Sequence, residues 1–208
     1  WSVSSLYSKT YYDANPISKR FVQKFSMSPD QLKELADYCK DKGISFSSTP
    51  YSEEEVDFLV EECHVPYIKI ASMELDNPKF LRYIGAKQVP IILSTGMSSM
   101  QEVEEAVSIL HSVGVEQMAI LHCVSIYPTI LHSVNLNNIL GLREKFGMHP
   151  IGFSDHTEGD AAAVAAIALG ASVIEKHLTL DRSKVGMDNG MATEPLAFTQ
   201  LVDKCRNI

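Results

Sequence analysis

Two histidines occur in similar surroundings in the last third of the chain. His156 lies in the run IGFSDHT (151–157), and His177 lies in the run VIEKHLTLD (173–181). Imidazole nitrogens suit manganese, iron, zinc and similar ions, and carboxylates and water complete the harder sites. Glu175 and Asp188 are the acids nearest to these histidines in sequence. The pattern predicts a divalent-metal site held by His156 and His177; the alternative is two structural histidines that only make hydrogen bonds.

The segment between the two histidines is expected to be one helix. Its sequence, DAAAVAAIALGA (160–171), is rich in the best helix-forming residue. A strand, a helix and a second strand in this order normally give two parallel neighbours with a right-handed crossover. Both histidines would then leave the same end of one sheet, close enough to share an ion.

A cation and several hydroxyl groups form a second candidate group. Lys69 interrupts the apolar run YIKIAS (67–72), and an unpaired ammonium that faces an interior is costly. Lys69 therefore indicates an anionic ligand, unless it extends to solvent or pairs with Glu74. Glu74 is a candidate acid or base, or a cap of the following helix. Hydroxyl residues close several apolar runs and together suit the oxygens of a small anion, although each alone also suits a turn or cap: Thr49, Ser72, Ser94, Thr95 and Ser154.

The chain repeats one unit, a short apolar run followed by an amphipathic helix. A first helix is expected after Ser28-Pro29, a typical cap and first-turn pair, and residues 1–26 are expected to be irregular with room for a short helix. The six predicted strands are 44–50, 67–72, 90–97, 118–125, 151–157 and 173–181. The helices that follow them are expected to begin near Ser52, Asn77, Ser99, Asn135, Asp160 and Glu194.

These six units recur at about 25-residue intervals, the length of one strand, one helix and two short loops. Buried strands alternating with helices predict an α/β fold with a parallel sheet. A doubly wound open sheet and a barrel both fit this order. Polar residues at the end of every strand favour the barrel, because barrels place their sites at that face. The prediction is a (β/α)8 TIM barrel that lacks its first two strands, with residues 1–208 forming a single partial domain.

Composition restricts the classes of function. The chain has 208 residues, of which 45% are hydrophobic, and a formal net charge of -8. This charge gives no basic footprint for nucleic acid, although local groups can still bind an anion. No run reaches the roughly 18–20 apolar residues of a membrane span. The four cysteines lack CxxC spacing and are expected to be free thiols in a reducing cytoplasm. The chain starts at Trp1 without a signal-peptide pattern and is expected to be a fragment of a longer protein.

Several of these runs together resemble the sialic acid synthase family, which includes the synthases for N-acetylneuraminate, legionaminate and pseudaminate. The resemblance covers about residues 20–208. The matching runs are LHCVSIYPT (121–129), IGFSDHTEG (151–159), IEKHLTLDR (174–182), YIKIAS (67–72) with Glu74, and ILSTGM (92–97). The paired histidine runs are the specific part of this likeness.

The resemblance implies a condensation of phosphoenolpyruvate with an open-chain N-acetylhexosamine, such as N-acetylmannosamine, and release of phosphate. It also implies a divalent ion, most often Mn²⁺, with Mg²⁺ or Co²⁺ as alternatives, held by His156 and His177 as a Lewis acid. Glu74 and Glu175 match acids that handle water and protons, and Tyr127 and Asp188 match sugar-side residues. The matching phosphoenolpyruvate contacts are Thr49, Lys69, Ser72, Ser125 and Ser154. The resemblance also implies a homodimer for the full-length protein.

The chain also departs from the family pattern. Neither the first two barrel strands, which supply an acid, a Lys and a Gln, nor the C-terminal antifreeze-like domain has a counterpart in this sequence. Ser125 stands where some members have Asn, and Asp188-Asn189 stands where Asp-His is usual, which indicates a different sugar. Two other functions stay open. One is a non-catalytic remnant that binds an anion or a partner protein, and the other is a retro-aldolase or hydrolase on the same metal barrel.

Overall fold

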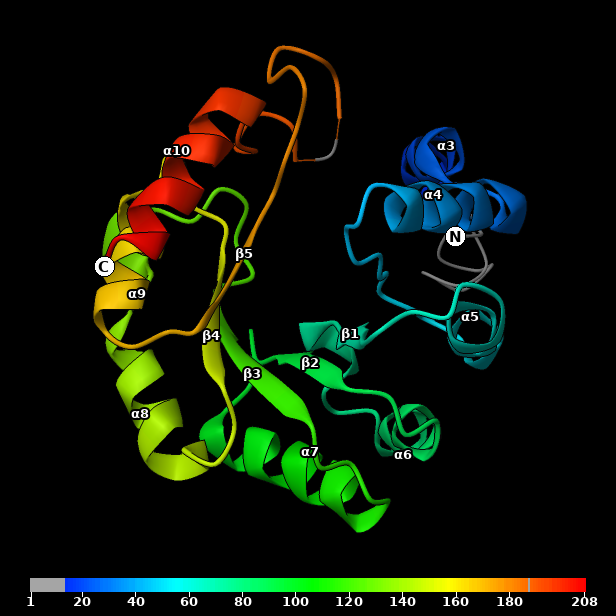
Figure 1. Cartoon of the computed structure of the whole chain (residues 1–208), viewed down its shortest axis with the longest axis horizontal. Coiled ribbons are helices and arrows are strands. Elements are labelled where there is room, and N and C mark those ends of the chain that lie inside the picture. The colour runs from blue at the N-terminus through cyan, green and yellow to red at the C-terminus, as the bar shows by residue number, and fades with distance from the viewer. Residues whose placement is uncertain (1–13, 187) are drawn as a thin grey trace. The chain divides into compact units, whose positions relative to one another are not determined.

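Five short strands form one sheet in the computed structural model, which describes residues 14–186 and 188–208. The spatial order β1-β2-β3-β4-β5 is also the order along the chain (Figure 1). The strands are β1 (Ile68–Ile70), β2 (Ile91–Ser94), β3 (Met118–Cys123), β4 (Ile151–Asp155) and β5 (Val173–Lys176). Pairing is parallel between β3 and β4 and between β4 and β5. Because sequential strands are neighbours, the sheet has no reversal of strand order of the kind that a doubly wound fold needs.

The predicted strand at 44–50 is wrong. This stretch contains no strand in the structure, and its first apolar residue, Ile44, is exposed. The Ser47 hydroxyl donates a hydrogen bond to the backbone oxygen of Tyr67 over 2.6 Å. A side chain thus bonds the carbonyl that precedes β1. The other five predicted strands are confirmed, each shorter than its apolar run.

Helices follow the strands as predicted. Ser28 caps α4 with a reciprocal pair of hydrogen bonds to Gln31, a capping box that satisfies two donors of the first turn. A short helix also forms before it, while residues 1–13 lie outside the described part of the chain. The helices are α3 (Pro16–Phe25), α4 (Pro29–Asp41), α5 (Glu53–Asp57), α6 (Pro78–Ala86), α7 (Met100–Ser112), α8 (Asn137–Phe146), α9 (Ala161–Ala168) and α10 (Pro195–Arg206). Three single turns, η1 (Phe58–Glu62), η2 (Ser72–Glu74) and η3 (Leu131–Ser133), complete the elements.

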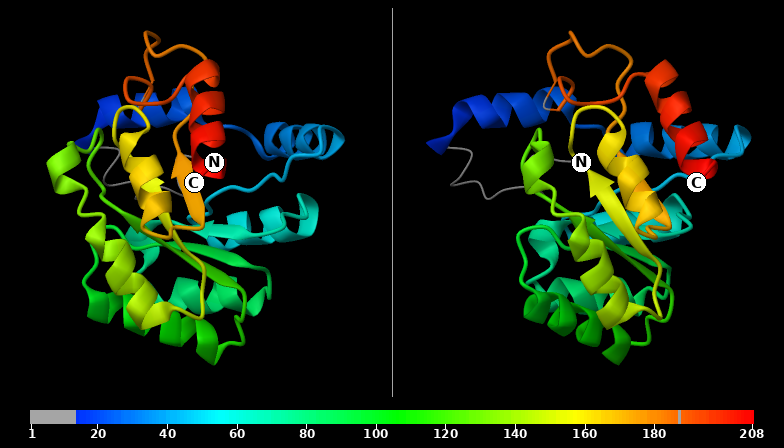
Figure 2. Two further views of the ribbon diagram at one scale, coloured as in Figure 1. Left: turned by 60° about the vertical axis from the view of Figure 1, so that its left-hand side comes forward. Right: turned by 90° about the vertical axis from the view of Figure 1, so that its left-hand side faces the viewer.

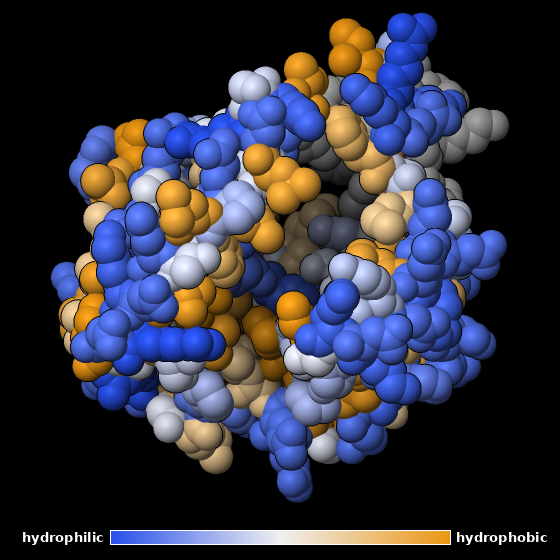
Figure 3. Space-filling model, turned by 45° about the horizontal axis from the view of Figure 1, so that its top comes forward, coloured by the Kyte–Doolittle hydropathy of each residue, from blue (hydrophilic) through white to orange (hydrophobic). Residues whose placement is uncertain are grey.

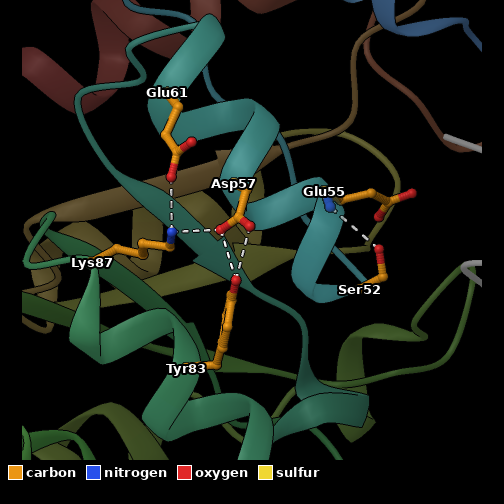
Figure 4. Close-up of polar contacts among 6 residues, drawn as sticks. All are labelled: Ser52, Glu55, Asp57, Glu61, Tyr83 and Lys87. Atoms are coloured by element: carbon orange, nitrogen blue, oxygen red, sulfur yellow. Dashed lines mark hydrogen bonds and ion pairs between the residues drawn. The ribbon is translucent and has the colours of Figure 1, made fainter.

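The first of two compact units comprises Trp1–Ile70, Asp76–Ile91 and Ala106–Glu116. In this unit a polar cluster joins α5 and η1 to the end of α6 (Figure 4). Lys87 contacts Asp57 at 2.5 Å and Glu61 at 3.0 Å, and the Tyr83 hydroxyl donates to Asp57 at 2.8 Å. These hydrogen bonds raise the pKa of Lys87 and lower the pKa of Asp57. The cluster ties three helical segments together, and Thr49 and Lys69 belong to the same unit.

The second unit comprises Ala71–Leu75, Ile92–Glu105 and Gln117–Ile208. Helices α8 and α9 pack against β3 and β4, and α10 packs on α9, along one side of the strands in Figures 1 and 2. Phe153 of β4 is buried, and so are Ala162, Ala163 and Ala166 of α9. Most of the candidate site lies in this unit. The single-domain prediction stays a prediction.

Hydrophilic side chains cover much of the face drawn in Figure 3, with hydrophobic ones interspersed. In the described part of the chain, no helix combines the length and the apolar character that crossing a bilayer requires. All four cysteines are free thiols, as predicted.

Candidate active site

The ends of β4 and β5 carry three successive pairs of residues that face each other. The backbone register pairs Ser154 with Glu175 and Asp155 with Lys176. The Ser154 hydroxyl donates to Glu175 Oε1 over 2.6 Å, and Lys176 Nζ lies 2.8 Å from Asp155 Oδ2. Because successive side chains of a strand point to opposite faces, these two contacts lie on opposite faces of the sheet.

The next pair is His156 and His177, whose ring centroids are 5.4 Å apart. The prediction that the two strands bring these histidines together is confirmed. The Tyr127 ring lies 4.2 Å from the His156 ring and 6.0 Å from the His177 ring. Asp188 Oδ2 lies 3.7 Å from His177 Nδ1. Four of the predicted residues, from three different segments, therefore meet at one place.

Hydrogen bonding defines which nitrogen of His156 is available to a metal ion. Its Nδ1 lies 2.8 Å from the backbone oxygen of Val124, and a carbonyl only accepts hydrogen bonds. Nδ1 must therefore carry the proton. Nε2, which faces the Ser154 hydroxyl at 3.3 Å, then has its lone pair. A carbonyl that orients an imidazole in this way is the usual partner of a metal-binding histidine.

Burial favours the neutral form of this ring. His156 is buried, and burial, opposed by the hydrogen bond to Val124, lowers the pKa of His156 below its ordinary value. A neutral imidazole is the form that binds metal. Among the described residues, no group of three or more His, Cys, Asp or Glu side chains is spaced to hold an ion. Any metal held here would need oxygens from water or substrate in addition to the two imidazoles.

The loop after β3 is held close to His156 by its own polar groups. The Thr129 hydroxyl donates to the Ile126 backbone oxygen at 2.7 Å, and the Thr129 backbone N–H donates to the His156 oxygen at 2.9 Å. His122, on β3, bonds the Val134 oxygen at 2.7 Å. Together these contacts place Tyr127 against the imidazoles.

A second cluster of polar groups surrounds Gly96, just after β2. The Gly96 N–H donates to the Ser72 hydroxyl at 2.9 Å, and Ser72 Oγ lies 3.2 Å from Cys123 Sγ. A Cβ placed on Gly96 would lie 2.4 Å from Ser125 Oγ and 2.9 Å from Ser72 Oγ. Two of the predicted anion-binding hydroxyls therefore converge on a residue without a side chain. Ser94 lies two residues before Gly96, and its hydroxyl is buried without a hydrogen-bond partner.

The remaining predicted residues are placed as follows. Thr95 is buried and its hydroxyl bonds the Leu121 oxygen at 3.0 Å, so it joins β2 to β3. Glu74 ends η2, two residues after Ser72. Thr49 and Lys69 are half-buried in the first compact unit, and their part in an anion site stays a prediction. Gly96, Cys123 and the Asp155–Lys176 pair were not predicted from the sequence.

The burial of two histidines gives a prediction about pH and stability. Burial lowers the pKa of His122 and of His156 below the ordinary 6.5. As the pH falls below 6.5, the unfolded chain takes up protons on these histidines before the folded chain does. We therefore expect the free energy of unfolding to fall with pH from about 6.5 downward, by at most about 1.4 kcal/mol per pH unit for each histidine. Above that pH both states are neutral, so these histidines no longer make the free energy of unfolding depend on pH.

Urea unfolding between pH 5 and 8 measures this slope. His122→Gln should reduce it, whereas His132→Gln, at an exposed position in η3, should leave it unchanged. A slope that is the same in both variants and in the wild type would contradict the assignment.

Comparisons with known proteins show the family of the chain. The chain belongs to the NeuB family, whose sequence profile matches residues 4–208. It is 39% identical over 191 residues to the N,N'-diacetyllegionaminic acid synthase of Campylobacter jejuni, covering 91% of this chain and 57% of the relative. It is 36% identical over 179 residues to the N-acetylneuraminate-9-phosphate synthase of Homo sapiens, covering 86% of this chain and 49% of the relative.

A solved structure has the same fold. The N-acetylneuraminic acid (sialic acid) synthetase of Leptospira borgpetersenii, in complex with citrate, superposes with a TM-score of 0.90 at 32% identity, covering 96% of this chain and 69% of that one. The sequence-based resemblance to sialic acid synthases is thus confirmed, and so is the fold class, a parallel α/β half-barrel of the TIM-barrel kind. The absence of two particular strands stays a prediction. The chain spans roughly half to two thirds of the relatives it matches.

Proposed function

We propose that the protein containing this chain condenses phosphoenolpyruvate with an open-chain N-acetylhexosamine and releases phosphate. The observation that carries the proposal is the meeting of His156 and His177, with ring centroids 5.4 Å apart, at the ends of neighbouring parallel strands. The names of the relatives, which are synthases of acidic amino sugars, support the same reaction. The particular amino sugar is left to experiment.

The metal part of the proposal depends on the donor set. His156 Nε2 and the His177 ring would hold a divalent ion, most often Mn²⁺, with Mg²⁺ or Co²⁺ as alternatives. When bound, the ion supplies Lewis acidity to the sugar aldehyde. The Val124 oxygen keeps the proton of His156 on Nδ1, and Asp188, whose Oδ2 lies 3.7 Å from His177 Nδ1, would orient the His177 ring. Tyr127 covers both rings and would contact the sugar.

The hydroxyl groups would bind the other substrate. Ser72 and Ser125, which converge on Gly96, would present short polar groups to the oxygens of phosphoenolpyruvate. Ser154 would join them, because it is the register partner of Cys123, whose Sγ lies 3.2 Å from Ser72 Oγ. Thr49 and Lys69 complete this set in the proposal. Hydroxyl and ammonium donors to a charged oxygen make the stronger class of hydrogen bond. They would orient the phosphoenolpyruvate so that its C3 faces the aldehyde.

The proposed reaction balances as follows. C3 of phosphoenolpyruvate forms a bond to the aldehyde carbon, whose oxygen takes up a proton. Water adds to C2, and phosphate leaves by cleavage of its C–O bond. Glu74 and Glu175 would accept and return the protons, and Glu175 is already hydrogen-bonded to Ser154 at 2.6 Å. The predicted homodimer and cytoplasmic location belong to the same proposal.

Phosphate release tests this function. The intact protein is incubated with phosphoenolpyruvate and a panel of 2-acetamido sugars, with Mn²⁺ or with a chelator. We expect phosphate only when one of the sugars and the metal are both present. Phosphate without sugar would indicate a hydrolase, and binding of phosphoenolpyruvate without turnover on any sugar would indicate the non-catalytic alternative.

A further inference from the structure

A buried ion pair lies directly beside the two histidines and has no part in the proposed chemistry. The side chains of Lys176 and Asp155 are 1% and 0% exposed, with 2.8 Å between Nζ and Oδ2. Lys176 Nζ also donates to the Thr157 backbone oxygen at 2.6 Å. Asp155 Oδ1 accepts from the Thr157 backbone N–H at 2.8 Å. Both charged groups are therefore paired and hydrogen-bonded.

Stability alone does not explain this pair. Removing two charges from water is expensive, and replacing a buried ion pair by apolar side chains of similar volume is often neutral or stabilising. The neighbouring positions of β4, such as Phe153 and Ile151, are occupied by apolar residues. An ion pair at this depth is therefore better explained by the geometry that it imposes.

The ion pair is linked to the backbone that carries His156 and His177. Asp155 and Lys176 are register partners on β4 and β5, and each immediately precedes one of the histidines. The residue after His156, Thr157, is bonded to both members of the pair. The backbone of His156 is thus held on both sides, and the same contact ties it to the strand that carries His177. Because strand side chains alternate, the pair does this from the opposite face and leaves the histidine face clear.

We propose that the Asp155–Lys176 ion pair is a positioning device that sets the separation of His156 and His177 for a divalent cation. The inference rests on the proposed function for its metal. Residues that orient metal ligands typically change metal affinity by about tenfold to a hundredfold when they are mutated, and we expect a loss of that size here.

Double variants separate positioning from stability. Asp155→Leu/Lys176→Met removes both charges, so no unpaired charge is left in the interior, and Asp155→Asn/Lys176→Gln does so while keeping hydrogen-bonding groups. Lys176→Met alone leaves Asp155 unpaired and should lower the melting temperature. The matched control is Lys204→Met, which breaks an exposed ion pair with Asp160 of 2.5 Å in the same compact unit.

Two measurements are made on the intact protein. The dissociation constant for Mn²⁺ is obtained from the electron paramagnetic resonance signal of the free ion. The ring ¹⁵N shifts of the two histidines, recorded without metal, report the proton position on His156. We expect a double variant to keep a melting temperature near that of the wild type, to bind Mn²⁺ about tenfold to a hundredfold more weakly, and to lose the single Nδ1-protonated form of His156.

The outcomes distinguish the two proposals. If the wild type binds Mn²⁺ and a folded double variant binds it equally well, the positioning inference is overturned and the proposed function stands. If the wild type does not bind Mn²⁺, the metal part of the proposed function fails. In that case the ring ¹⁵N shifts test the positioning inference. Shifts that are the same in the wild type and in a folded double variant would overturn it.

Discussion

His156→Ala is expected to remove nearly all metal-dependent turnover of phosphoenolpyruvate. The substitution deletes Nε2, the nitrogen whose lone pair is directed away from the hydrogen bond to Val124. With a Lewis acid that lowers the barrier by about 4 kcal/mol, its loss slows the reaction roughly a thousandfold. The measurement is the rate of phosphate release at saturating sugar and Mn²⁺, with Mn²⁺ binding measured on the same sample.

His132→Ala is the matched control, because this imidazole is exposed on η3 in the same compact unit. It should keep the rate within about twofold of the wild type, since surface substitutions seldom change the structure. His177→Ala should behave like the His156 variant. A folded His156→Ala protein that retains a metal-stimulated rate would rule out this imidazole as a ligand.

Local signals in the sequence were sufficient to predict the helices. Ser28, Ser52 and Asn77 were each expected to precede a helix, and each side chain accepts a hydrogen bond from a backbone N–H of the first turn. Such caps involve residues only three positions apart, so no knowledge of the fold is required. The order of apolar runs then predicted the sheet, because sequential parallel strands joined by helices are usually neighbours.

Local signals could not show whether residues 44–50 form a strand. A run of alternating small and apolar residues becomes a strand only if a neighbouring strand offers its backbone groups. Here the Ser47 side chain bonds the carbonyl before β1, and Ile44 stays exposed. The sequence shows the apolar pattern but not the partner, which is a property of the fold.

The histidines of the site were predictable, and the groups that support them were not. His156 and His177 end apolar runs, so topology alone brings them together. Lys176 reads as an ordinary surface lysine, because its burial depends on which face of β5 it occupies and on its register with Asp155. Gly96 contributes to the site because it has no side chain, which lets the hydroxyls of Ser72 and Ser125 approach its backbone. The run STGM around it does not indicate that these hydroxyls will lie there.

Gly96→Ala is therefore the second substitution expected to have a large effect. The new Cβ would lie 2.4 Å from Ser125 Oγ, 2.8 Å from Cys123 Sγ and 2.9 Å from Ser72 Oγ. All three are terminal atoms of short side chains, so they can move, and both hydroxyls would turn away from their present positions. A hydrogen bond to a charged oxygen contributes about 1.5–3 kcal/mol, so misplacing even one of them should raise the KM for phosphoenolpyruvate about tenfold to a hundredfold.

The matched control is Gly141→Ala in α8, where an added Cβ would meet nothing within 4 Å. It should leave both KM values unchanged and stabilise the protein by about 0.5–1 kcal/mol through helix propensity.

Steady-state phosphate release, with each substrate varied in turn, checks both variants. For Gly96→Ala we expect the KM for the sugar to change far less than that for phosphoenolpyruvate, because the imidazoles and Tyr127 are not displaced. Equal KM values for phosphoenolpyruvate in the wild type and in a folded Gly96→Ala protein would mean that the hydroxyls around Gly96 do not bind it. Overpacking of this kind also costs about 1–3 kcal/mol of stability, so a lower melting temperature with an unchanged KM would assign Gly96 to packing alone.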